Sequence, residues 1–276
     1  MFTQKMIVNA MKVDPKANLE VELRKRIDFI KNMLENTGMK HLVLGISGGV
    51  DSLTAGRLCQ LAVNELNYEV GVGHEFIAVR LPYGNQLDED DAQTAIKVIE
   101  PTRVVKVDIA AAVIAAEQDV IEALNASGIN ANNPEKNDFV KGNIKARTRM
   151  VIQYTIANQV NGLVVGTDHS AEATMGFYTK FGDGACDLAP LFGLNKRQVR
   201  GLAKMLGAPE QLYGKPATAD LEELAPQALD EDRLGVTYDE LDDFLEGKTV
   251  NENTAMRIKN QYVLTEHKRA PIPTPA

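Results

Sequence analysis

A glycine-rich segment constrains the fold more than any other part of the chain: Gly45-Ile46-Ser47-Gly48-Gly49-Val50-Asp51-Ser52. It follows the apolar residues 42–44 and precedes an amphipathic stretch at 53–66, so it predicts a tight turn between a buried strand and the start of a helix. Glycines let the backbone approach an anion closely, and the first amides of a helix have no partner within the helix. The segment therefore predicts a phosphate-binding loop.

The end of this loop departs from two common phosphate-binding patterns. It has neither the Gly-Lys-Ser/Thr ending of kinase and GTPase loops nor the Gly-x-Gly-x-x-Gly spacing of dinucleotide-binding loops. An acidic side chain among phosphates repels them unless a cation lies in between, so Asp51 is a candidate magnesium ligand. The alternative is an ordinary turn in which an aspartate caps a helix and binds no ligand.

The size and charge of the chain limit the classes of function. Of its 276 residues, 44% are hydrophobic and 25% charged, which is enough for one large core or two small ones. We expect a single domain over residues 1–276, with a flexible proline-rich tail at 270–276. The net charge of -8 argues against a general binder of nucleic acid or membrane surfaces, because such proteins need a positive surface. A polyanionic substrate would therefore need a local basic pocket.

The cysteines and the N-terminus indicate a compartment. Cys59 and Cys186 lie far apart, so they form neither a metal-spaced pair nor a disulfide framework, which favours a reducing cytoplasm. Residues 1–5 lack an apolar signal core, and no run of about 18 apolar residues occurs. We expect a cytoplasmic protein that is neither secreted nor inserted in a membrane.

Short apolar runs alternate with helical patterns along the chain. Strands are predicted at 42–46, 76–79, 104–107 and 163–165, and helices at 23–34, 53–66, from 88, at 111–126 and at 138–160, with a loop at 127–137. This alternation predicts an α/β fold with a doubly wound parallel sheet and helices on both faces. Ligands of such folds bind beyond the carboxyl ends of the strands, where the loops after Gly45, Arg80 and Gly166 must gather.

A second polar segment, Gly166 to Glu172, also follows a predicted strand. Taken alone, it could be only a capped helix start. If its strand lies near the first one, however, Glu172 comes close enough to Asp51 to share a metal-phosphate cluster. The glycines and aromatic residues at 175–187 favour a mobile or ligand-shaping loop.

Several motifs together resemble those of one enzyme family. The Ser-Gly-Gly-Val-Asp-Ser run resembles the pyrophosphate loop of N-type ATP pyrophosphatases. Over residues 20–270 the chain is similar to the ammonia-dependent NAD synthetases, through GNIKARTR at 142–149, GTDHSAEATMGFYTKFGDG at 166–184, LNKRQ at 194–198 and His267-Lys268. The resemblance implies the adenine nucleotide alpha hydrolase-like fold and the last step of NAD biosynthesis. In that step ATP adenylates the nicotinate carboxylate of deamido-NAD, and ammonia then displaces AMP to give NAD.

The resemblance also implies roles for particular residues. Asp51 and Glu172 are expected to bind Mg²⁺ and, with Lys196, to form the catalytic group. ATP is expected to contact Gly45 to Ser52, Arg80, Gln86, Thr167, Lys196 and Thr218. Deamido-NAD is expected to contact Arg147, Lys180, Asp187, His267 and Lys268. A homodimer with the deamido-NAD site at its interface is expected, and the many apolar positions of the helix at 138–160 give this weak support.

Some residues depart from the family pattern, and some roles have alternatives. Cys186 and Ala185 stand where the family usually has small residues or glycine, which leaves the path of that loop open. Among the neighbouring basic residues we favour Arg147 over Arg149 as a ligand contact. Residues 82–87 and 207–230 are candidate lids, because closure would keep water from the adenylate.

Two other functions compete with the synthetase. Another enzyme of the same superfamily, such as a tRNA-thiolating or GMP-forming one, would share the first loop, although thiolation normally needs paired cysteines and a basic RNA-binding face. A non-catalytic nucleotide-binding module would not need the second acid at Glu172.

Glutamine-dependent relatives carry an extra amidase domain, for which this chain has no room, so we expect free ammonia as the nitrogen donor.

Overall fold

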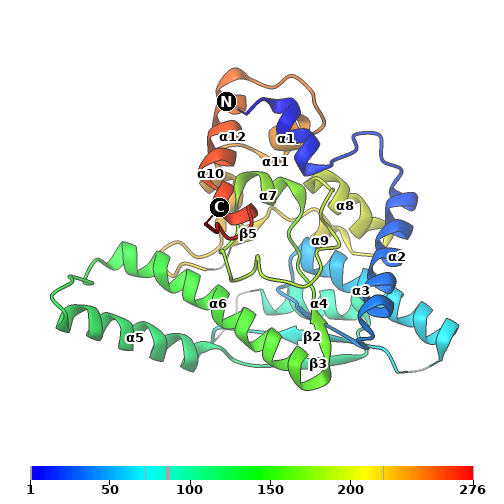
Figure 1. The fold of residues 1–276 in the computed structure, drawn as a ribbon, viewed down its shortest axis with the longest axis horizontal. Helices are drawn as coiled ribbons and strands as arrows, with labels where there is room; N and C mark the ends of the chain where they lie inside the picture. Colours follow the sequence, from blue (N-terminus) through cyan, green and yellow to red (C-terminus); the bar gives the residue numbers. More distant parts are fainter. Residues whose placement is uncertain (1, 72, 85–87, 220, 276) are drawn as a thin grey trace.

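A computed structural model describes residues 2–71, 73–84, 88–219 and 221–275 (Figure 1). Within these ranges the central sheet has the strands β1 (His41–Gly45), β2 (Glu75–Arg80), β3 (Arg103–Lys106) and β4 (Gly162–Val164). Their order in the sheet is β3-β2-β1-β4, and all pairs are parallel. Each strand begins and ends within one residue of its predicted position, which confirms this part of the sequence analysis.

The register of the strands brings their carboxyl ends to one edge. Leu42 of β1 is level with Phe76 of β2 and Leu163 of β4, and Ala78 of β2 is level with Val104 of β3. The loops after Gly45, Arg80 and Gly166 therefore start from the same edge, as predicted, and β4 lies beside β1. Beyond β4, Val165 forms a parallel bridge with Leu188.

One face of the sheet is covered by α3 (Val50–Val70), which contacts β1 and β2. Around α3 lie α2 (Leu19–Thr37), α4 (Glu89–Ile99) and α8 (Lys196–Met205), as Figure 1 shows. The side chains that point to this face form a fully buried apolar cluster, including Leu42, Leu44 and Phe76 with Leu53 and Leu58 of α3. Burial of this extent is the main contribution to the stability of the sheet.

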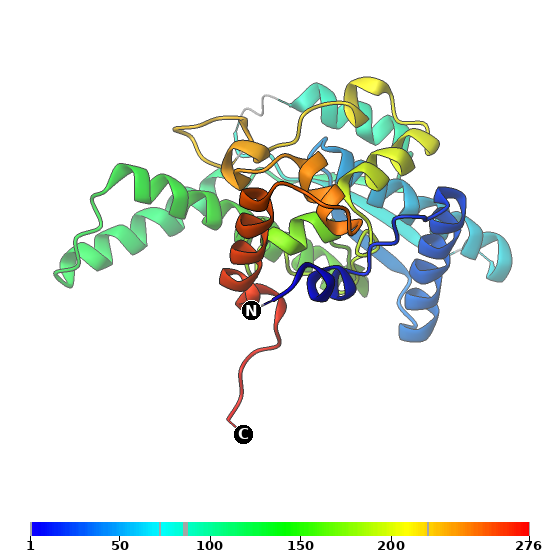
Figure 2. The same ribbon diagram turned by 90° about the horizontal axis from the view of Figure 1, so that it is seen from above.

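The opposite face is covered by α6 (Pro134–Val160), which contacts β1 and β4, and by α5 (Ala110–Ala126), which packs along α6. Alternate strand residues such as Val43, Ile77 and Val79 point to this side, as the period of a strand requires. Helices on both faces confirm the doubly wound fold. Figures 1 and 2 both show α5 and α6 extending past the rest of the chain at one end.

The start of α6 differs from the prediction. The helix begins at Pro134 instead of residue 138, so the expected loop at 127–137 is too long. Asn133 caps the helix by accepting a hydrogen bond from the Lys136 amide, 3.0 Å away. Proline suits the first helical turn because its missing N–H would have no partner there. An asparagine followed by proline is thus a helix start here and not part of the loop.

A further group of helices packs beyond the carboxyl edge of the sheet. It contains α1 (Gln4–Met11), α7 (Ser170–Met175), α10 (Asp230–Leu234), α11 (Tyr238–Leu245) and α12 (Glu252–Leu264), followed by α13 (Glu266–Arg269). Ile7, Ala171, Phe244 and Ile258 belong to its buried apolar cluster. This group holds α7, which follows β4 and carries Glu172.

The remaining elements are short. Residues 207–230 contain α9 (Glu210–Tyr213) and an antiparallel pair, β5 (Thr218–Ala219) with β6 (Ala228–Leu229). Residues 271–275 have no regular structure, and Figure 2 shows this tail pointing away from the helices. Within the described ranges, no helix is both long and apolar enough to cross a membrane.

Candidate active site

The glycine-rich loop joins β1 to α3 through a backbone turn that only glycine fits. Gly48 has φ +98°, and a Cβ at this position would lie 2.8 Å from the backbone nitrogen of Ala92 in α4. Gly49 is the N-cap of α3 and supplies no capping side chain, which leaves the first amides of α3 directed at the loop. The loop therefore has the properties of an anion-binding turn.

The other residues of the loop anchor this turn. Ile46 and Val50 are buried in the apolar cluster, and the Gly45 amide donates to Gln153 Oε1 at 2.6 Å. The Ser47 hydroxyl lies 3.2 Å from Ser52 Oγ and accepts a hydrogen bond of the same length from the Gly49 amide. Side-chain hydroxyls thus hold the backbone in place before any ligand binds, which reduces the ordering cost of binding.

Two carboxylates meet at the end of this loop, as the sequence predicted. Asp51 lies in the first turn of α3 and Glu172 in the first turn of α7. With His169, they offer one ligand atom each within 4.8 Å of one another. Asp51 Oδ1 is buried and accepts no hydrogen bond from any residue the structure describes. A free buried acceptor beside a second carboxylate fits Mg²⁺, which prefers oxygen ligands and binds through one or two carboxylates and phosphates.

Lys196 forms the cationic part of this cluster. Its side chain is 1% exposed, and its Nζ lies 2.7 Å from Asp51 Oδ2 and 3.7 Å from Glu172 Oε1. The Lys196 amide donates to Asp242 Oδ1 at 3.0 Å, which fixes the start of α8. Burial lowers the pKa of Lys196, but Asp51 and Glu172 outweigh it and raise that pKa. The lysine is therefore a charged partner of both acids.

His169 positions Glu172 from two directions. The Glu172 amide donates to His169 Nδ1 at 3.4 Å, which caps α7, and His169 Nε2 lies 3.2 Å from Glu172 Oε1. Burial opposes ionisation of Glu172, yet His169 and then Lys196 outweigh it and hold its pKa below the usual range. His169 therefore both caps α7 and orients the Glu172 carboxylate.

Asp168, next to this histidine, was missed as a site residue. Its pKa is raised well above the usual value, first by burial and then by the charges of Glu172, Asp183 and Asp51. Its position inside the motif at 166–172 was visible, but the sequence did not show that other carboxylates would surround it.

Four of the five residues predicted to contact deamido-NAD are joined through the segment 176–183. Arg147 on α6 donates to the Lys180 carbonyl at 3.3 Å, and Lys180 Nζ donates to the His267 carbonyl at 2.6 Å. Lys268 Nζ donates to the carbonyls of Gly176 and Tyr178 at 2.7 and 2.6 Å. The segment expected as mobile or ligand-shaping is therefore fastened to α13 in this structure. The fifth residue, Asp187, instead accepts the Val164 amide at 2.7 Å beside β4.

The predicted ATP contacts outside the loop have different surroundings. Arg80, at the end of β2, is 1% exposed and pairs with the half-exposed Glu89 at 2.9 Å, so this ion pair fixes its position. Thr167 is half-buried directly after the β4 edge, and Thr218 lies in β5. Gln86 lies outside the described residues.

The basic residues of α6 do not behave alike. Arg147 is exposed, whereas Arg149 donates to the Leu81 carbonyl at 3.1 Å. Lys145, not singled out from the sequence, is buried, with its Nζ 4.1 Å from the Tyr83 ring centre and 3.0 Å from the Leu221 carbonyl. It therefore links described parts of the two candidate lids, 82–84 and 221–230. Closure of these lids stays a prediction, and residues 85–87 and 220 lie outside the described ranges.

Cys186 is a packing residue in this structure. A Cβ on Gly166 would lie 3.0 Å from Cys186 Cβ, so the cysteine lies directly against the glycine at the end of β4. Burial first, and then the charges of Asp168 and Asp187, raise the pKa of its thiol to about 11. The thiol is protonated at neutral pH and is not a nucleophile there.

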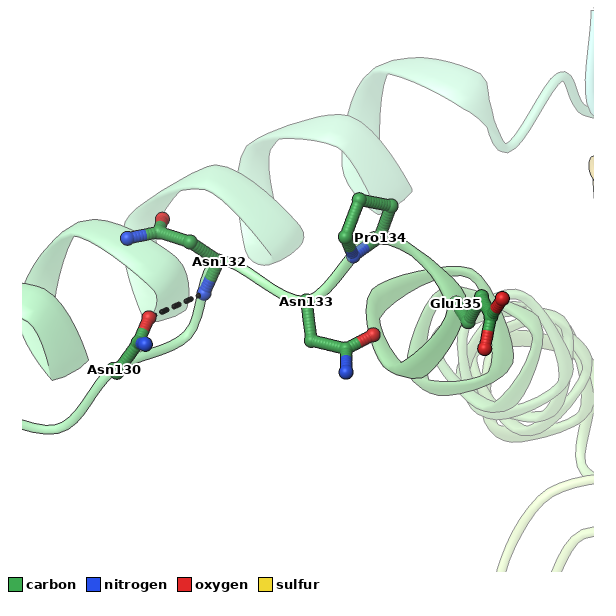
Figure 3. A pocket seen from close by; sticks show the side chains of 5 residues that line it. All are labelled: Asn130, Asn132, Asn133, Pro134 and Glu135. Atoms are coloured by element: carbon green, nitrogen blue, oxygen red, sulfur yellow. Dashed lines mark hydrogen bonds between the residues drawn. The ribbon is translucent and has the colours of Figure 1, made fainter.

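A surface hollow of about 540 Å³ lies away from these residues, at the turn between α5 and α6 (Figure 3). Its lining is Asn130, Asn132, Asn133, Pro134 and Glu135. The Asn132 amide donates to Asn130 Oδ1 at 3.0 Å, and Asn133 is the cap of α6, so these polar groups serve the turn itself. The hollow contains none of the predicted site residues.

Comparison with known proteins decides the family. The sequence profile described as NAD synthase matches residues 22–272. The chain belongs to the NAD synthase family. Within it, the NH(3)-dependent NAD(+) synthetase of Aliivibrio salmonicida (strain LFI1238) is 57% identical over 272 residues, covering 98% of this chain and 99% of that protein.

Solved structures of similar proteins agree with this NAD synthase membership. NAD+ synthetase from Burkholderia pseudomallei has a TM-score of 0.82 and 44% identity, covering 96% of this chain and 95% of that chain. NMN synthetase from Francisella tularensis has a TM-score of 0.79 and 31% identity, covering 94% and 99% of the two chains. The resemblance inferred from the motifs and the α/β fold are thus confirmed, whereas the roles given to single residues stay predictions.

Proposed function

We propose that the protein is an ammonia-dependent ligase that converts deamido-NAD, ATP and ammonia into NAD, AMP and pyrophosphate. The observation that carries this proposal is the meeting of a phosphate-binding turn with Asp51, Glu172 and Lys196 at one edge of the sheet. Membership of the NAD synthase family supports the choice of substrates. A module that only binds nucleotides has no need of two half-buried carboxylates beside a phosphate-binding turn.

The chemistry gives each part of this site a task. A carboxylate is a poor acceptor for ammonia because hydroxide is a poor leaving group. The nicotinate oxygen therefore attacks the α-phosphorus of ATP and expels pyrophosphate. Ammonia then forms the C–N bond, and the carbonyl carbon releases AMP. An anion attacks an anion in the first step, so the amides of residues 47–52 and the Lys196 ammonium must neutralise the phosphates.

Asp51 and Glu172 are proposed to hold Mg²⁺, which fits their oxygen donors and an Asp51 Oδ1 that accepts no hydrogen bond from the described residues. When bound, the ion would supply positive charge to the phosphates. Arg147, Lys180, His267 and Lys268 supply a local basic region on a chain of net charge -8. That region is where we place the anionic dinucleotide. Once the adenylate exists, positioning is enough for the second step, and no covalent enzyme intermediate is needed.

A coupled product assay tests the proposal. Purified protein is incubated with Mg²⁺, ATP, ammonium and deamido-NAD, and NAD, AMP and pyrophosphate are quantified separately. We expect equal yields of all three. A parallel reaction replaces deamido-NAD by nicotinic acid mononucleotide, since one similar structure is named for NMN synthesis. Faster turnover of the mononucleotide would shift the substrate assignment, and absence of ATP turnover with either acceptor would contradict a ligase.

We also propose a homodimer, formed through the projecting pair of helices α5 and α6, with the deamido-NAD site at its interface. Exposed apolar side chains occur along this pair, including Val120, Phe139, Val140 and Val151. A run of exposed apolar residues is typical of an interaction surface.

The two free cysteines suit a reducing compartment, and we place the enzyme in the cytoplasm.

Sedimentation velocity at micromolar concentration tests the dimer. We expect the dimer mass for the natural chain and dissociation, with a raised KM for deamido-NAD, for Val151→Lys. Val70→Lys is the matched control, because Val70 is equally apolar and exposed but lies at the end of α3. A fully active monomer would overturn the interface and the shared site together.

A further inference from the structure

The carboxylates at the phosphate loop already have a cation of the chain as their partner. Lys196 Nζ lies 2.7 Å from Asp51 Oδ2 and within ion-pair distance of Glu172 Oε1, at 3.7 Å. The exposed fractions of the three side chains are 1%, 19% and 14%. At such burial the charges are poorly screened by water, so removing or adding one charge changes the others' interactions strongly.

The surroundings of Lys196 give its ammonium an alternative to the two carboxylates. His169 Nε2 lies 3.3 Å from Nζ, and the Tyr238 ring centre lies 4.9 Å away on the side of α11. Behind this ring, the Tyr238 hydroxyl donates to Asp230 Oδ2 at 3.2 Å, while Asp230 Oδ1 is buried with no hydrogen-bond partner among the described residues. The ammonium can therefore shift away from Asp51 and still face an aromatic ring and an acid.

We propose that Lys196 is a built-in counter-ion that competes with the divalent cation for Asp51 and Glu172, and moves to the nucleotide phosphates when metal and ATP enter together. The inference rests on the proposed function, because the metal ion and ATP are those placed there. A divalent ion next to the lysine would repel it, whereas a triphosphate attracts both. Metal alone therefore binds weakly, and metal and nucleotide bind cooperatively.

Removal of the lysine charge should change two affinities in opposite directions. In Lys196→Met, the carboxylates lose their counter-ion, so Mn²⁺ alone should bind at least about tenfold tighter than in the natural chain. ATP should bind at least about tenfold more weakly, because a phosphate partner is lost. If Lys196 only contacted phosphate, its replacement would weaken ATP binding and leave the affinity for Mn²⁺ unchanged.

The experiment measures Mn²⁺ binding without nucleotide, by calorimetry or by the loss of the free-ion EPR signal. The natural chain is compared with Lys196→Met, with Lys196→Arg, which keeps the charge, and with Lys204→Met, which removes an exposed charge from the same helix. We expect tighter Mn²⁺ binding in Lys196→Met alone. Should that variant fail to fold, Lys196→Gln carries the same test.

The outcomes separate this inference from the proposed function. Asp51→Asn is included to show that the bound Mn²⁺ uses this site. If Mn²⁺ binds through Asp51 but its affinity in Lys196→Met is equal to or lower than in the natural chain, the counter-ion role of Lys196 is wrong and the metal site remains supported. If Asp51→Asn leaves the Mn²⁺ affinity unchanged, both the metal site and the inference are wrong. The product assay tests the ligase activity independently. If Lys204→Met raises the Mn²⁺ affinity as much as Lys196→Met does, the effect comes from the net charge of the chain, and this outcome also contradicts the inference.

Discussion

Replacing Glu172 by glutamine should lower kcat by roughly a hundredfold to a thousandfold, while ATP still binds. The amide keeps the shape of the side chain and its place in α7, but it removes the charge that His169 and Lys196 stabilise. Phosphate contacts made by the loop amides do not depend on that charge. Turnover is measured by the product assay, and binding by calorimetry with a non-hydrolysable ATP analogue.

Glu135→Gln provides the control for this variant. Glu135 also lies in the first turn of a helix, α6, but it is exposed at the turn shown in Figure 3. It should retain full turnover. If Glu172→Gln kept its turnover as well, the second carboxylate would have no catalytic task and the binding-module alternative would gain support. Thermal denaturation of both variants shows whether any loss comes from unfolding.

The second large effect is expected for Gly48→Ala. A Cβ at Gly48 would meet the backbone nitrogen of Ala92 at 2.8 Å, and the residue has φ +98°, which alanine rarely adopts. We expect the free energy of unfolding to fall by about 1–3 kcal/mol and the KM for ATP to rise at least about tenfold. Chemical denaturation and initial-rate kinetics measure the two effects.

Gly49→Ala is the matched comparison, because it adds the same methyl group one residue later. Gly49 has φ -73°, and its added Cβ would lie 3.4 Å from Ser47 Oγ, an ordinary contact. Its loss of stability should be clearly smaller. Equal losses in the two variants would show that the loop tolerates neither methyl group for some reason other than backbone conformation and the contact with α4.

The parts of this protein that follow local rules could be predicted from its sequence. Four short apolar runs separated by helical patterns specify a parallel sheet, and parallel strands place their following loops at one edge. The meeting of Asp51 with Glu172 is a direct consequence, since each follows one of two adjacent strands, β1 and β4.

The parts that depend on distant contacts could not be predicted. Lys145 is buried because the Tyr83 ring and the Leu221 carbonyl surround its ammonium, and neither is near it in sequence. A charged residue on a helix is usually solvated, so nothing local distinguished it from Arg147. The helices around α7 were not predicted for a related reason: their apolar cluster joins segments from both ends of the chain, which lie far apart in sequence.

The helix that carries Glu172 is too short to be stable alone, since it spans only Ser170–Met175. Segments from opposite ends of the sequence hold it: Ser170 Oγ donates to the Met11 carbonyl at 2.7 Å, and Arg269 donates to the Ala173 carbonyl at 2.8 Å. Substitutions in α1 and α13 are thus expected to lower activity by loosening Glu172, a proposed metal ligand. Substitutions that lower the activity of this enzyme are therefore expected at more positions than those that contact its substrates.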